Sequence, residues 1–222
     1  MITPKETEKE FDKFFRQINY DRVFDDVGSS PGFNNADYVN QTKRIIVELK
    51  VLDEERMPDG GIINCLNSII IKPEQINEYG YGSYSLELPE PDKNGRLDSG
   101  LRKSLISVLK KANKQLRETK SFYCNDSEFT GYVILAHSGF MSLSPEVTSG
   151  VVTDILNTQF SSIDGALICT PHYNLVNSLT RRLDYPYVLV AKKLDTLLSN
   201  QCLELSNDWY DFYLKGGHTK AF

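Results

Sequence analysis

The chain has 222 residues, of which 40% are hydrophobic and 25% are charged, as is usual for a folded globular protein. This length suits a single domain, or one domain with a sizeable insertion. The net charge of −5 is unlike that of a protein that simply coats nucleic acid.

Neither a membrane segment nor a cysteine motif stands out in the sequence. No apolar run reaches the roughly 18 residues that a membrane-spanning helix needs, and the charged opening MITPKETEKEF does not form a signal segment. We therefore expect a cytoplasmic protein that does not engage a membrane. The four cysteines are far apart and form no C-x-x-C pair, which argues against a zinc ribbon or a redox motif. Cys169, within the apolar stretch GALICT, is expected to be a buried thiol.

The first predicted element is a helix with a clear start. Thr3 can act as its N-cap, Pro4 suits the first helical position, and Glu6 completes a capping box. Apolar side chains then recur at steps of three and four residues and predict one buried face, formed by Phe11, Phe14, Phe15 and Ile18. After this helix we expect a short extended piece near 22–24 and a turn-rich loop.

The segment 34–51, NNADYVNQTKRIIVELKV, predicts a β-hairpin. Its first strand carries Asp37, its turn covers residues 40–43, and its second strand runs to about Val51. Because residues two apart in a strand share a face, Glu48 and Lys50 project together while the opposite face is aliphatic. Asp37 can lie opposite or diagonal to Glu48. Two carboxylates beside a lysine suit Mg²⁺, which takes one or two carboxylates and keeps other positions for water and substrate phosphate.

The pattern of Asp37, ten intervening residues and then Glu48-Leu49-Lys50 resembles the PD-(D/E)XK nuclease superfamily, which has the restriction-endonuclease-like fold. The resemblance implies that Asp37 and Glu48 ligate Mg²⁺, with Mn²⁺ as a substitute, and that Lys50 orients the attacking water. Ala36 stands where the family often has a proline, which takes no part in the chemistry.

The resemblance also implies that an acid from the first helix reaches the metal. Glu8 is our first choice and Glu10 the alternative. The ordinary preference of a helix's first turn for acids explains either residue equally well.

A loop-rich insertion is expected at about 52–100, followed by a long amphipathic helix at 99–119. The segment 101–120 has seven basic residues and one acid, a net charge of +6, so the remainder of the chain carries −11. Such a basic stripe suits phosphate contact, and it equally suits a solvated helix face. We name Lys111, Lys114, Arg102 and Lys103 as the candidate nucleic-acid-binding residues. The family resemblance implies that a residue of this helix faces the metal and phosphate. Gln115 is our first choice and Lys111 our second.

The rest of the chain predicts buried strands at 132–136 and 165–169, a helix at about 145–160, a late strand at 187–191 and a C-terminal helix at 194–214. The predicted fold class is therefore α/β, with a central mixed sheet flanked by helices. The order of elements matches a restriction-endonuclease-like core. We expect one domain over 1–222, with a C-terminal extension at about 171–222.

The expected function is Mg²⁺-dependent hydrolysis of phosphodiester bonds. DNA is the expected substrate, and RNA is the alternative. Asp37, Glu48, Lys50 and Gln115 would form the catalytic group, and a restriction or defence role follows from the resemblance alone. Cleavage of both strands of a duplex would favour a homodimer, although no segment of the sequence identifies a dimer interface. The alternative is a non-catalytic nucleic-acid-binding or regulatory domain that keeps the fold.

Overall fold

A six-stranded mixed β-sheet forms the centre of the protein in the computed structural model, which describes residues 3–28, 32–52, 70–76, 82–87, 96–123, 129–138, 145–171, 175–176, 183–184, 187–191 and 196–215. The strands lie in the order β1 (Asp21–Arg22), β2 (Tyr38–Asn40), β3 (Ile45–Leu52), β6 (Thr130–His137), β7 (Gly165–Cys169) and β10 (Tyr187–Ala191). The first three strands pair antiparallel, β3, β6 and β7 pair parallel, and β10 is antiparallel to β7.

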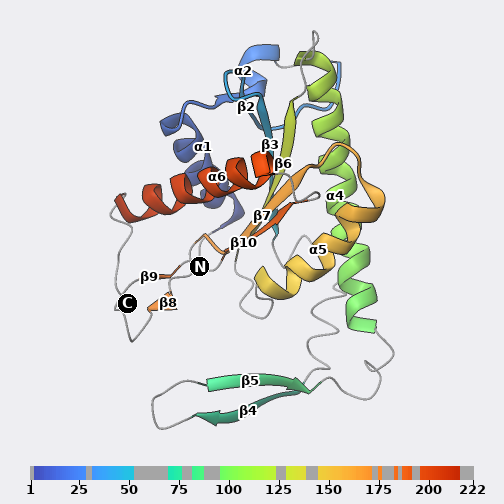
Figure 1. The fold of residues 1–222 in the computed structure, drawn as a ribbon, viewed down its shortest axis with the longest axis vertical. Helices are drawn as coiled ribbons and strands as arrows, with labels where there is room; N and C mark the ends of the chain where they lie inside the picture. The colour runs from blue at the N-terminus through green and yellow to red at the C-terminus, as the bar shows by residue number, and fades with distance from the viewer. Residues whose placement is uncertain are drawn as a thin grey trace.

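Helices cover both faces of this sheet (Figure 1). One face packs against α4 (Arg96–Tyr123) and α5 (Pro145–Gln159), and the other packs against α1 (Pro4–Gln17) and α6 (Thr196–Lys215). The predicted mixed sheet with flanking helices is therefore confirmed. Within the described residues, no helix is both long and apolar enough to cross a membrane.

Two cores result from the alternation of side chains along β3 and β6. Val47 and Ile134 face α1 and α6, whereas Ile46 and Val133 face α4 and α5. Both strands are buried on both sides, which explains the continuous apolar run in the sequence of β6. Full burial of one such side chain stabilises the fold by roughly 1.5–3 kcal/mol. Cys169, 2% exposed, is a core thiol as predicted.

The α1 helix forms as its sequence predicts. Thr3 caps its N-terminus and completes a capping box with Glu6. Phe11 and Phe14 are fully buried and pack on Trp209 of α6, with ring centroids of Phe11 and Trp209 4.2 Å apart. This packing holds α1 against β3, so the helix presents its first turns to one edge of the sheet.

Several boundaries differ from the sequence prediction. The long helix starts at Arg96 and ends at Tyr123, so it exceeds the predicted 99–119 at both ends. The segment after α1 contains a two-residue strand, β1, and then the short helix α2 (Val23–Val27) rather than an extended piece at 22–24. Asp25 and Asp26 lie in the first turn of α2, where the helix dipole favours acids. The prediction missed α2 because five residues are too few for a clear helical period.

Two hairpins lie outside the central sheet. Strands β4 (Ile70–Ile76) and β5 (Gly82–Glu87) pair antiparallel within the predicted insertion, as Figure 1 shows. Strands β8 (Leu175–Val176) and β9 (Leu183–Asp184) form the second pair. The other residues of the insertion, 53–69, 77–81 and 88–95, lie outside the described part of the chain.

Candidate functional site: a two-carboxylate centre at the edge of the sheet

The β2–β3 hairpin places Asp37 opposite Glu48. Tyr38 pairs with Val47, so the next position in the register joins Asp37 to Glu48. Asp37 itself lies in a bend just before β2 rather than inside a strand. Its Oδ2 accepts a 2.8 Å hydrogen bond from the backbone N–H of Leu49, which fixes the carboxylate beside the part of β3 that extends past its pairing with β2.

The Glu48 carboxylate is almost completely buried. Its side chain is 1% exposed, and its Oε2 has no hydrogen-bond partner among the residues that the structure describes. Burial and the negative charge of Asp37 raise the pKa of Glu48 well above its usual range, although Lys50 opposes this shift. Burial likewise raises the pKa of Asp37, against the effect of the Leu49 N–H. The two carboxyl groups are close enough to share one proton or one cation.

Lys50 connects the carboxylates to α4. Its Nζ donates one hydrogen bond to Glu48 Oε1 and a second, of 2.9 Å, to Gln115 Oε1. The Gln115 amide in turn donates a 3.0 Å hydrogen bond from Nε2 to the carbonyl oxygen of Asn35. The four residues predicted as catalytic, Asp37, Glu48, Lys50 and Gln115, therefore lie together.

The same turns of α4 hold the segment that leads into Asp37. Glu118 Oε2 accepts hydrogen bonds from the backbone N–H and the side-chain amide of Asn34, at 2.7 and 2.8 Å. Thr119 Oγ1 accepts a buried 2.8 Å hydrogen bond from the N–H of Ala36. Sequence reasoning missed both helix residues. The signal for Glu118 was present, because it is the one acid in the basic segment 101–120.

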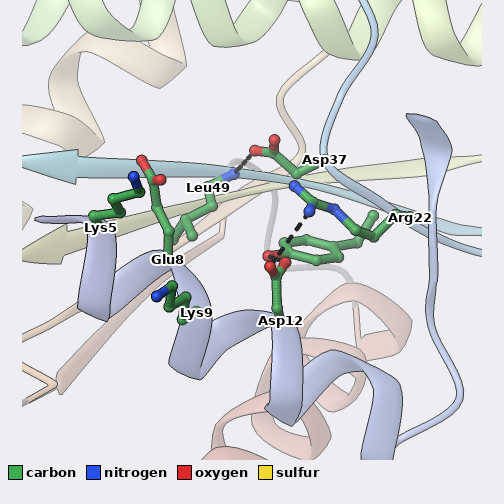
Figure 2. Close-up of a pocket in the computed structure, with 8 residues that line it drawn as sticks. Lys5, Glu8, Lys9, Asp12, Arg22, Asp37 and Leu49 are labelled. Atoms are coloured by element: carbon green, nitrogen blue, oxygen red, sulfur yellow. Dashed lines mark hydrogen bonds and ion pairs between the residues drawn. The ribbon is translucent and has the colours of Figure 1, made fainter. Parts of the chain in front are cut away.

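A pocket opens in front of Asp37, on the α1 side of the sheet edge (Figure 2). It has a volume of about 280 Å³ and is lined by Lys5, Glu8, Lys9, Asp12, Arg22, Asp37, Tyr38 and Leu49. Glu8, our first choice from the leading helix, thus lines the same pocket as Asp37, whereas Glu10 is not among the lining residues. No motif or spacing singles out Arg22 or Lys5, which the fold brings to this pocket.

The basic residues named on α4 fall into two groups, one near Gln115 and one near the start of the helix. Lys114 forms a 3.7 Å ion pair with Glu118, and Lys111 is exposed one turn before Gln115. Arg102 forms a 3.1 Å ion pair with Asp154 of α5. Arg102 precedes Gln115 by 13 residues, which corresponds to about 20 Å along the helix axis. Its exposed neighbour, Lys103, is nearly as far away. The structure therefore separates Arg102 and Lys103 from the two-carboxylate centre.

The acids of the site form a pair rather than a larger cluster. In the described ranges, no three or more His, Cys, Asp or Glu side chains gather closely enough to hold a metal ion. A cation at this place would take its protein ligands from Asp37 and Glu48, with Glu8 within the adjoining pocket. This donor set suits Mg²⁺ better than Zn²⁺, which prefers Cys and His ligands.

Comparison with protein-family models, with curated proteins and with solved structures found no match to this chain. The resemblance to the PD-(D/E)XK superfamily therefore stays a prediction from the residues quoted above, and so does the restriction-endonuclease-like form of the core.

Proposed function

We propose that the protein is a nuclease that hydrolyses phosphodiester bonds with the help of a divalent cation, and that its substrate is DNA. The observation that carries this proposal is the buried Oε2 of Glu48, which lacks a hydrogen-bond partner among the described residues and lies beside a second carboxylate. A buried carboxylate oxygen without a partner costs free energy. A divalent cation between Glu48 and Asp37 would offset this cost.

The chemistry of the donors supports Mg²⁺ or Mn²⁺ as the cation. Mg²⁺ is commonly held by one or two carboxylates and completes its shell with waters and substrate phosphate oxygens. The pocket before Asp37, about 280 Å³ in volume, offers space for such waters and a phosphate group, since one water occupies roughly 30 Å³. A bound cation supplies a water of lowered pKa and neutralises negative charge on the reacting phosphate.

Each residue of the centre has a distinct part in this proposal. The Leu49 N–H holds the Asp37 carboxylate at the sheet edge. Lys50, at 23% side-chain exposure, holds a positive charge against Glu48, where it would stabilise the charge that develops on the phosphate. Gln115 is a positioning residue, because it holds the Lys50 ammonium from the side of α4.

The arrangement of elements supports the same proposal. The elements follow in the order expected for a restriction-endonuclease-like core. This order is a leading helix, the hairpin that carries the acids and the lysine, a long helix, and a strand parallel to β3. A restriction or defence role rests on the resemblance alone.

Nicking of supercoiled plasmid tests the proposal. We expect cleavage by the wild type with Mg²⁺ or Mn²⁺ and none with EDTA. Asp37→Asn and Lys50→Met should each lose the activity, whereas Asp25→Asn, which makes the same change on the exposed surface of α2, should keep it. Activity that survives in both site variants would refute the assignment.

One observation favours the non-catalytic alternative. Lys50 is already held between Glu48 and Gln115, as in an ion-pair network with a purely structural role. In that case the wild type would bind nucleic acid without cleaving it, and divalent cations would leave the bound nucleic acid intact.

A further inference from the structure

The pocket in front of Asp37 has a basic wall that the proposed hydrolysis does not use. Lys5 and Lys9 project from α1 on the left of Figure 2, on either side of Glu8, while Asp37, Arg22 and Asp12 lie on the right. Three cations therefore face a pocket whose acids are Glu8, Asp12 and Asp37.

Only some of the charged side chains of this pocket form ion pairs with one another. Arg22 forms a 3.3 Å ion pair with Asp12, which also accepts a 2.7 Å hydrogen bond from the hydroxyl of Tyr38. Asp37 belongs to the two-carboxylate centre, and Glu8 lines the same pocket from α1. Lys5 and Lys9 form no ion pair with any other residue that the structure describes. A divalent cation would cancel the charges of Asp37 and Glu48, and Arg22 already offsets that of Asp12, so the two ammonium groups outnumber the one remaining acid, Glu8.

The geometry of α1 suits contact with a chain of phosphates. Lys5 and Lys9 are four residues apart, so they share one side of the helix and differ by about 6 Å along its axis. Lys5 lies in the first turn of α1, where the positive end of the helix dipole adds to its charge, and Lys9 lies in the next turn. Two of the basic residues named on α4 are already paired, Arg102 with Asp154 and Lys114 with Glu118, and no residue of α4 lines the pocket.

We propose that Lys5 and Lys9 bind the phosphate backbone of a nucleic acid strand beside the phosphate that is cut. The strand then approaches the centre across the first half of α1 instead of along the basic face of α4. This inference rests on the proposed nuclease function, and it adds the path of the substrate. Contacts of this kind position a strand without reading its sequence.

The test compares two double variants of α1. Lys5→Ala/Lys9→Ala removes the two charges of the pocket, and Lys13→Ala/Arg16→Ala removes two exposed charges of the same helix outside the lining. Binding of a short labelled DNA duplex is measured at several salt concentrations with Ca²⁺ in place of Mg²⁺, after a check that the duplex stays intact. Cleavage with Mg²⁺ then gives kcat and KM for each variant.

We expect the pocket variant to lower the slope of log affinity against log salt by about two, since each lost phosphate contact removes about 0.9 from it. Its KM should rise while its kcat stays close to that of the wild type, because the lysines bind substrate and transition state alike. The matched variant should do neither. The inference would be overturned if the pocket variant and the wild type had the same salt slope. It would also be overturned if both double variants lost the same amount of DNA affinity. A protein that binds in this lysine-dependent way without cleaving would refute the nuclease and keep the binding path.

Discussion

Lys50 Nζ donates a 2.9 Å hydrogen bond to Gln115 Oε1 and so joins the strand that carries the acids to the helix that covers it. Gln115 also donates a 3.0 Å hydrogen bond to the carbonyl oxygen of Asn35, two residues before Asp37. One amide therefore fixes the lysine of the centre and the segment that delivers one of its carboxylates. We expect the centre to lose its geometry when this amide is removed.

Gln115→Ala tests that role. The variant should lower kcat of plasmid nicking by about 10- to 100-fold, the usual effect of a lost residue that orients a metal site. It should destabilise the fold by only about 1 kcal/mol, because a single hydrogen-bonded side chain is lost. Ser107→Ala, an exposed change on the same helix, is the control. An activity equal to that of the control would show that Gln115 does not position Lys50.

Thr119 should stabilise the fold through its contact with Ala36. Thr119→Val removes the acceptor of a buried backbone N–H, and we expect a loss of about 1–3 kcal/mol in urea unfolding. Thr119→Ser keeps the hydroxyl and should lose much less. If the two variants unfold at the same urea concentration, the hydrogen bond has no stabilising role.

Glu48→Gln should stabilise the cation-free protein. Burial and Asp37 raise the pKa of Glu48, so the folded state holds this proton more tightly than the unfolded state does. The wild type therefore loses stability as the pH rises from the ordinary pKa of a glutamate, about 4.3, towards the raised value. With EDTA at neutral pH, the variant should be more stable by about 1 kcal/mol and melt a few degrees higher.

This advantage should shrink at acidic pH, where Glu48 is protonated in both states of the wild type. Thermal melts at several pH values with EDTA measure it, and Asp25→Asn is the control for a general effect of charge. A variant that is less stable than the wild type at neutral pH would contradict the account. The same variant should have no nicking activity, since it lacks one of the two carboxylates.

Gly131 marks a close approach between β6 and the loop before β7. A Cβ at this position would clash with the carbonyl oxygen of Ser162. Gly131→Ala should therefore destabilise the protein by about 1–3 kcal/mol, the typical cost of overpacking. Gly150→Ala meets open space on the exposed side of α5 and should stabilise by about 0.5–1 kcal/mol. Urea unfolding of both variants tests the contrast, and equal effects would contradict it.

The parts of the fold that could be predicted from the sequence are those that depend on local patterns. The capping box at Thr3, the aliphatic face of β3 and the buried strands all depend on residues close in sequence. The anchors of the Asp37 segment were not predictable in this way, because Glu118 and Thr119 bond to residues 84 and 83 positions away. Such contacts leave no period in a single sequence. The placement of Lys5 and Arg22 around one pocket has the same cause.

Diffraction from crystals soaked with Mn²⁺ shows whether Asp37 and Glu48 hold a cation, because the anomalous signal locates the ion. We expect a peak between Asp37 and Glu48, with Glu48 Oε2 at about 2.1 Å, a distance typical of a small hard cation. The peak should be absent in crystals of Glu48→Gln. A peak elsewhere on the chain, or none in wild-type crystals at a Mn²⁺ concentration that supports nicking, would contradict the two-carboxylate metal centre.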